Sequence, residues 1–154
     1  MRRLMARVWR ALGGRVQWRV SWLLNAKFMV GVTGVVRDDA GRVLLLRHRF
    51  WAEGRDWGLP TGYAKRDESF QDTVVREVRE ETGLEVKVGD LVRLNSGYRL
   101  RAEAAYEAVL VGGTLTLDPT EILEAAWFTP DNLPTGLQPS HRPLILGEPN
   151  QPDP

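Results

Sequence analysis

The sequence has no cysteine and only two histidines, His48 and His141. The lack of cysteine excludes disulfide bonds and thiolate metal sites, and two histidines are too few for a multi-histidine zinc site. A metal site in this chain must therefore use carboxylate and carbonyl oxygens. This ligand set favours Mg²⁺ and also suits Mn²⁺.

Long apolar runs are missing as well. No stretch of about 18 apolar residues occurs, so no segment is predicted to span a membrane. Arginines interrupt each candidate apolar segment of a secretory signal, and we expect a cytoplasmic protein. At 154 residues the chain suits one domain of ordinary size with a sizeable core.

Acidic residues are absent from residues 1–27, although the whole chain carries a formal net charge of +1. The segment holds seven basic residues: Arg2, Arg3, Arg7, Arg10, Arg15, Arg19 and Lys27. The rest of the chain holds 14 basic and 20 acidic residues. We therefore interpret residues 1–27 as a basic, tryptophan-rich extension that precedes the main domain.

Two parts of this extension show apolar periodicity. Residues 1–12 are predicted to form a helix with Val8 and Trp9 on its apolar face and arginines on the other. Residues 16–22 alternate between apolar and polar, which favours a strand, although a second helix running to Leu24 is the alternative. We favour packing of the extension on the domain or in a homodimer. Contact with an anionic membrane surface or with RNA is the alternative.

A dense group of acidic residues follows in the middle of the chain. Glu77 precedes Glu80 by three residues and Glu81 by four, and residues at these spacings are neighbours on a helix. Such crowded carboxylates repel one another unless a positive charge lies among them. A divalent cation is the simplest compensating charge because it prefers oxygen ligands, whereas the plainer alternative is a solvated acidic helix face.

A helix is predicted over residues 68–82 to carry these acids. Asp67 is expected to cap its start, and Gly83 suits the left-handed conformation that commonly ends a helix. The buried stripe recurs at a spacing of four residues: Phe70, Val74 and Val78.

The same stretch resembles the signature of the Nudix hydrolases. That signature is a glycine, five residues, a glutamate, seven residues, Arg-Glu, an aliphatic residue, one residue, Glu-Glu, one residue, a glycine and an aliphatic residue. The constrained positions are occupied by Gly62, Glu68, Arg76, Glu77, Val78, Glu80, Glu81, Gly83 and Leu84. The resemblance implies an α/β fold, an α/β/α sandwich in which a mixed β-sheet lies between helices and a loop–helix–loop motif carries the catalytic residues.

The resemblance also implies a Mg²⁺-dependent hydrolase that cleaves a phosphoanhydride bond in a nucleoside diphosphate linked to another moiety. Nucleotide sugars, dinucleoside polyphosphates, CDP-alcohols and nucleoside triphosphates all stay open as substrates, because the signatures of the NADH, coenzyme A and ADP-ribose subgroups are absent. One alternative is a non-catalytic nucleotide-binding regulatory module on the same fold, which need not keep a full set of acids. Another is an RNA 5′-end pyrophosphohydrolase that holds RNA through residues 1–27.

By this resemblance, the metal ligands are the backbone carbonyl of Gly62 and four carboxylates: Glu68, Glu77, Glu80 and Glu81. Arg76 is expected to orient a catalytic carboxylate by a bidentate contact, or else to form a surface ion pair with Glu80 or Asp72. The general base is expected within the helix, at Glu77 or Glu81, or on a later loop, at Glu121.

Substrate contacts are expected from the loop before Gly62 and from a turn after the motif. Arg47, Arg49 and Arg55 form a positive rim in the sequence, together with His48, which alone is expected to be an exposed strand-end residue. A nucleobase could stack on Trp51, with Phe50 and Trp57 as neighbours. Further candidates lie downstream: Tyr98, Arg99 and Tyr106.

The main domain is predicted to span residues 28–146, followed by a disordered tail over residues 147–154. Extended segments are predicted from β-rich runs between turn residues: 28–37, 42–47, 57–60, 84–88, 91–96, 102–111, 114–117 and 122–128. Residues 129–134 are expected to form a helical turn. Pro139 and Pro143 leave little room for a C-terminal helix, which we expect to be short.

Overall fold

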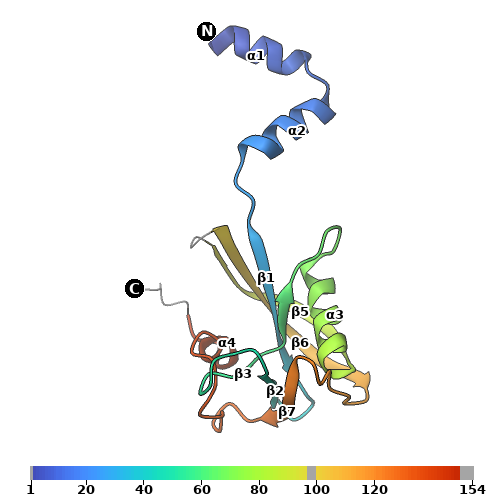
Figure 1. Cartoon of the computed structure of the whole chain (residues 1–154), viewed down its shortest axis with the longest axis vertical. Helices are drawn as coiled ribbons and strands as arrows, with labels where there is room; N and C mark the ends of the chain where they lie inside the picture. Colours follow the sequence, from blue (N-terminus) through green and yellow to red (C-terminus); the bar gives the residue numbers. More distant parts are fainter. Residues whose placement is uncertain (1, 97–99, 150–154) are drawn as a thin grey trace.

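The computed structural model describes residues 2–96 and 100–149 (Figure 1). Its helices are α1 (Arg2–Ala11), α2 (Gly14–Leu24), α3 (Phe70–Thr82) and α4 (Arg142–Leu146). Its strands are β1 (Met29–Arg37), β2 (Val43–His48), β3 (Trp57–Gly58), β4 (Thr61–Tyr63), β5 (Leu84–Ser96), β6 (Arg101–Gly113) and β7 (Ile122–Phe128).

The strands form one mixed seven-stranded sheet. Strands β3, β2, β1, β6 and β5 are neighbours in that order, while β4 pairs with β1 and β7 pairs with β2. β1 and β6 run parallel, from Met29 opposite Arg101 to Arg37 opposite Val109, and the other pairings are antiparallel. The parallel pair needs a long crossover, so it brings residues about 70 positions apart in the sequence to one place.

Helices cover both faces of this sheet, α3 on one and α4 on the other. The α3 side contains Val32, Val36, Leu44, Leu46, Val74 and Val78. The α4 side contains Val35, Val43, Leu45, Leu59, Leu144 and Ile145. Successive strand residues point to opposite faces, which explains why residues 43–46 are continuously apolar: both of their faces are buried. The predicted α/β/α sandwich with a mixed sheet is confirmed.

Helix α3 begins two residues later than predicted and has a different cap. Ser69 precedes it, and its Oγ accepts a hydrogen bond from the backbone N–H of Asp72 at 3.0 Å. The prediction that Asp67 caps the helix is wrong, because Asp67 lies in the loop with a positive φ of 63°. Gly83 ends the helix in the left-handed conformation, with φ 69°, as predicted.

Several other element predictions need correction. The strand over residues 16–22 is wrong and its alternative is right, because these residues belong to helix α2. Residues 84–88 and 91–96 form the single strand β5, whose register shifts between Val88 and Leu91. Residues 114–117 form no strand, and residues 129–134 form a hydrogen-bonded turn without a helix. The expected short C-terminal helix is confirmed as α4.

The two N-terminal helices stand apart from the sheet domain (Figure 1). They contact each other, since the side-chain amide of Gln17 donates to the Trp9 carbonyl at 2.7 Å, and α2 buries none of its residues. The prediction that this segment packs on its own domain is therefore wrong. Among the described residues, no helix is both long and apolar enough to cross a membrane.

The predicted tail begins within the described part of the chain. The carbonyl of Glu148 accepts a hydrogen bond from Arg93 Nη2 at 2.7 Å, which ties residue 148 to strand β5. Residues 150–154 lie outside the described residues, so a disordered tail remains a prediction for them.

Candidate active site

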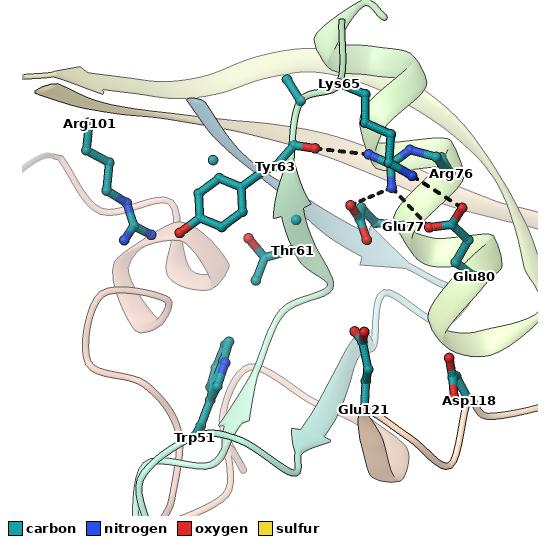
Figure 2. A pocket seen from close by; sticks show the side chains of 13 residues that line it. Trp51, Thr61, Tyr63, Lys65, Arg76, Glu77, Glu80, Arg101, Asp118 and Glu121 are labelled. Carbon is teal, nitrogen blue, oxygen red and sulfur yellow. Dashed lines mark hydrogen bonds and ion pairs between the residues drawn. The ribbon is translucent and has the colours of Figure 1, made fainter. Parts of the chain in front are cut away.

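A cleft of about 760 Å³ lies between α3, β4 and the loop that precedes β7 (Figure 2). Its lining residues come from separate parts of the chain: Gly31, Trp51, Thr61, Gly62, Tyr63, Ala64, Lys65, Arg76, Glu77, Glu80, Arg101, Asp118 and Glu121. The fold therefore brings the acidic face of α3 to the same cavity as Trp51, Arg101 and Glu121.

Arg76 lies at the centre of the motif's carboxylates. Its Nη1 donates to Glu77 Oε1 at 2.6 Å and to Glu80 Oε2 at 3.0 Å. Its Nε and Nη2 donate to the two oxygens of Glu68 at 2.7 and 3.1 Å, and Nη2 also reaches the Tyr63 carbonyl at 3.1 Å. These charge-assisted bonds, that to Glu68 first, raise the pKa of Arg76. The guanidinium therefore makes both contacts considered from the sequence, a bidentate one with Glu68 and an i+4 pair with Glu80.

Glu68 is held from several sides. Besides its two bonds to Arg76, it accepts from the backbone N–H of Lys65 at 3.0 Å and from the Thr73 hydroxyl at 2.9 Å. The hydrogen bonds from Arg76, followed by that from Lys65, lower its pKa to about 2. Glu68 is therefore ionised at neutral pH, and its oxygens already have protein donors. In this arrangement it anchors Arg76 against the loop.

Glu81 is the buried acid of the motif, with 4% of its surface exposed, and its Oε2 has no hydrogen-bond partner among the described residues. Burial, reinforced by the charges of Glu77 and Glu121, raises its pKa to about 9. His48 Nδ1 lies 4.0 Å from Glu81 Oε1, but burial lowers the pKa of His48 to about 4. Both shifts favour the neutral forms, so this contact is not an ion pair near pH 7.

His48 connects the acidic site to the aromatic wall of the cleft. The expectation of an exposed strand-end residue is wrong, because the side chain is buried. Its ring stacks on Trp51 with 3.8 Å between ring centroids and an interplanar angle of 11°. Trp51 in turn meets His141 edge-on at 5.8 Å. Trp51 is thus held in place from behind and presents its free side to the cleft.

The donor set fits a hard divalent cation. A Cβ on Gly62 would overlap the Glu77 carboxylate, so glycine permits the loop backbone to approach the acids closely. The buried Glu81 Oε2 lacks a partner, and cations satisfy such orphaned oxygens. Within residues 2–96 and 100–149, however, no three acidic or histidine side chains converge as a ready metal site.

A second group of acids faces α3 from the loop before β7. Figure 2 shows Asp118 and Glu121 directed toward the α3 carboxylates from the opposite wall. Asp118 Oδ1 accepts from the backbone N–H of Thr120 at 2.8 Å, which closes the loop into a turn. Arg49 holds the same loop, because its Nη2 donates to the Pro119 carbonyl at 2.9 Å and its N–H to the Glu121 carbonyl at 2.8 Å.

The residues predicted to bind substrate do not all lie at the cleft. Trp51 lines the cleft, as expected. Arg47 forms an ion pair with Asp56 at 2.7 Å and is not among the residues lining the cleft. Arg55 lines a second cavity of about 500 Å³. Arg49 supports the Glu121 loop, so of the predicted positive rim none lines the cleft itself.

The other aromatic candidates are structural or undescribed. Tyr98 and Arg99 lie outside the described residues, so their role stays a prediction. Tyr106 is buried in the core on the α3 side, and Trp57 packs edge-on against Phe128 with 5.3 Å between ring centroids. Neither ring is free to stack on a base.

Several residues that were not predicted from the sequence also line the cleft, and three of them carry aromatic or basic side chains: Tyr63, Lys65 and Arg101. Lys65 Nζ lies 3.7 Å from Glu80 Oε1, and the Arg101 guanidinium lies 5.7 Å from the Tyr63 ring centroid. Tyr63 and Lys65 belong to the loop of the motif, and this position in the sequence could have indicated that they lie at the site. Arg101 reaches the site only through the parallel pairing of β6 with β1.

An α/β/α sandwich whose loop–helix–loop motif places acidic side chains on a cleft is typical of hydrolases that bind a metal ion through carboxylates. Residues 27–146 match the family model described as the NUDIX domain. The chain therefore belongs to the Nudix hydrolase family. Members of this family typically use a divalent metal ion and act on nucleotides.

Several proteins are similar to this chain. The MutT-like protein of Streptomyces ambofaciens is 33% identical over 104 residues, which cover 68% of this chain and 66% of that protein. The NAD-capped RNA hydrolase NudC of Mycobacterium tuberculosis is 36% identical over 111 residues, which cover 67% of this chain and 33% of that protein. The crystal structure of a MutT NUDIX hydrolase from Burkholderia pseudomallei aligns with a TM-score of 0.68 and 25% identity, covering 79% of this chain and 98% of that one.

Proposed function

We propose that this protein hydrolyses a phosphoanhydride bond in a nucleoside diphosphate linked to another moiety, with Mg²⁺ or Mn²⁺ as its cofactor. The observation that carries the proposal is the convergence of acids on one cleft. Glu77 and Glu80 on α3 face Asp118 and Glu121 on the opposite loop, and Glu81 lies buried behind them. Such a concentration of carboxylates suits cations, and a diphosphate substrate needs them too.

The residues that would hold the cation are Glu77, Glu80, Glu81 and the carbonyl of Gly62. A bound divalent cation supplies charge neutralisation for the diphosphate and lowers the pKa of a water molecule. Arg76, anchored by Glu68, keeps Glu77 and Glu80 in position on α3. We assign Glu68 to this anchoring task because its oxygens already have protein donors.

Other cleft residues suit proton transfer and substrate binding. Glu121 faces the α3 acids from the second wall (Figure 2) and is the favoured general base, since it is free of the Arg76 network. The rings of Trp51 and Tyr63 form apolar walls for a nucleobase. The cations Lys65 and Arg101 line the same cavity and complement phosphate charge.

The test is a substrate panel assayed with the purified full chain. It contains nucleotide sugars, dinucleoside polyphosphates, CDP-alcohols and nucleoside triphosphates. It also contains NAD-capped RNA, since the mycobacterial relatives carry that name. We expect Mg²⁺-dependent release of a nucleoside monophosphate or a phosphate-containing product from at least one class, abolished by EDTA. No turnover of any member with Mg²⁺ or Mn²⁺ would point to the non-catalytic nucleotide-binding module instead.

A pair of variants then tests the site. Glu80→Gln should lower kcat at least about tenfold, because second-shell changes at metal sites already cost about that much. Glu85→Gln is the matched control, since Glu85 is an exposed acid on β5 that does not line the cleft, and it should leave turnover unchanged. Equal turnover of the two variants would remove Glu80 from the metal site.

A further inference from the structure

Helices α1 and α2 expose apolar side chains that nothing in the described structure covers. Trp18 is 66% exposed, Leu23 68% and Leu24 81%, and Met5 and Val8 on α1 are exposed as well. Both helices precede the strands of the sheet domain and stand away from it (Figure 1). Exposed apolar patches of this kind mark a surface that meets a partner.

Helix α1 has distinct apolar and basic faces, whereas α2 exposes apolar side chains on more than one side, with Arg15 and Arg19 between them. On α1, residues Met5, Val8 and Trp9 follow the i, i+3, i+4 spacing of one face, while Arg7 and Arg10 lie on the opposite side. On α2, a spacing of four residues places Arg15 and Arg19 together on one side of the helix and Val16 with Val20 on another. Trp18 and Trp22, also four residues apart, lie next to the Arg15 and Arg19 side.

Charge selects between the possible partners. Residues 1–27 hold seven basic residues and no acid, so a second copy of the same helices would bring like charges together. RNA offers negative charge but no apolar layer for Leu23 and Leu24. A membrane that contains anionic lipid offers both, with phosphate at its surface for the arginines and acyl chains beneath for the leucines.

The dimensions fit a helix pair that lies in the interface. Helices α1 and α2 have 10 and 11 residues, so they are about 15 and 17 Å long, about half of the roughly 30 Å hydrocarbon layer. Tryptophan favours the headgroup level of a bilayer, and arginine can reach the headgroups while its aliphatic stem stays apolar.

We propose that α1 and α2 attach this protein to membrane surfaces that contain anionic lipid, with their exposed apolar side chains buried in the interface. The attachment has a consequence for the cleft. Strand β1 begins at Met29, after the connecting residues 25–28 that follow the end of α2 at Leu24, and Gly31 already lines the cleft. The cleft is therefore held within a few residues of the membrane surface.

The test is co-sedimentation of the full chain with sucrose-loaded vesicles of phosphatidylcholine, either pure or with about a quarter phosphatidylglycerol. We expect at least tenfold tighter binding to the anionic vesicles, weakened by high salt. The variant Arg7→Glu/Arg10→Glu/Arg19→Glu should lose at least tenfold of this affinity. The variant Trp18→Ser/Leu23→Ser/Leu24→Ser should lose binding to a similar extent.

Matched controls change the same chemistry on the sheet domain. Lys87→Glu removes an exposed positive charge from β5, and Leu94→Ser removes an exposed apolar side chain from the same strand. Both should leave vesicle binding unchanged, and all variants should keep the melting temperature of the parent.

Three outcomes would overturn the proposal. Binding to neither vesicle type removes the lipid partner, and equal binding to both removes the proposed selection of anionic lipid. A dimer in sedimentation velocity that the serine variant dissociates assigns the apolar faces to a second copy. Binding to single-stranded RNA that only the glutamate variant abolishes, without vesicle binding, assigns the segment to nucleic acid.

Discussion

Gly62 lies so close to the Glu77 carboxylate that a methyl group on its Cα would overlap it. We expect Gly62→Ala to push Glu77 away from Arg76 and to lower kcat by roughly 10²-fold, since displacements of about 1 Å at a catalytic group cost this much. The control is Gly89→Ala, where a new Cβ would meet only ordinary contacts at 3.5 Å or more. Steady-state kinetics of both variants measures the effect. Equal kcat values would contradict the idea that activity depends on the close approach of Gly62 to Glu77.

A second prediction at the residue scale concerns His141 and pH. The backbone N–H of Leu59 donates to His141 Nδ1 at 3.0 Å, which requires that nitrogen to be unprotonated. Burial, together with the nearby His48, lowers the pKa of His141 from 6.5 to about 4. The unfolded chain therefore binds this proton more readily than the folded one. The stability due to His141 is fully present above pH 6.5 and is lost as the pH falls toward 4, by up to about 3 kcal/mol.

Urea unfolding of the parent and of His141→Gln measures this contribution. Glutamine can accept the Leu59 hydrogen bond without titrating, so we expect a flatter dependence of the unfolding free energy between about pH 6 and 4.5, by roughly 1 kcal/mol per pH unit. Glu81, whose raised pKa of about 9 acts in the opposite direction, is present in both proteins. The difference between them therefore isolates His141, and parallel curves would contradict its assignment as a neutral acceptor.

At the scale of elements, the start of α3 offers a direct comparison between two neighbouring residues. Ser69 caps the helix, so Ser69→Ala should lower the unfolding free energy by about 1 kcal/mol. Asp67 carries a positive φ of 63°, a conformation that glycine adopts without strain. Asp67→Gly should therefore leave the unfolding free energy unchanged or raise it by up to about 1 kcal/mol. Thermal unfolding of both variants tests this, and a loss for Asp67→Gly with none for Ser69→Ala would restore Asp67 as the cap.

Local spacing was sufficient to predict α3 and its acidic face, but not the contacts within that face. Periodicity places Glu80 near Arg76 at i+4, but it does not predict the contact of Arg76 with Glu77, which directly follows it in the chain. Glu68 lies eight residues before Arg76, outside the helix, so its bidentate contact depends on how the preceding loop folds back. No rule of helical spacing contains that geometry.

The failure at residues 16–22 has a different physical origin. Their alternating pattern fits a strand, but a strand needs a partner to satisfy its backbone N–H and C=O groups. Among the described residues no strand lies beside residues 14–24, whereas a helix satisfies these groups within itself. Arg101 could not be predicted for a related reason. It lies in the cleft because β6 pairs with β1, and this pairing is a property of the whole sheet that local sequence does not contain.

At the scale of the whole molecule, the chain consists of a sheet domain and an N-terminal helix pair that is joined to it by residues 25–28. In the described part of the chain, no hydrogen bond or ion pair links residues 1–27 to the rest. Asn25 and Lys27 bond back to α2, to the carbonyls of Ser21 and Leu23. The helices therefore contribute little to the free energy of the domain.

Deleting residues 1–27 should consequently shift the melting temperature by less than about 2 °C, since α2 buries none of its residues. The comparison is Val74→Ala in the full chain, which removes buried methyl groups between α3 and the sheet and should lower stability by roughly 1–3 kcal/mol. That loss corresponds to several degrees for a domain of this size. Scanning calorimetry measures all three proteins under one condition. A loss on truncation as large as that of Val74→Ala would mean that the helices pack on the domain in solution.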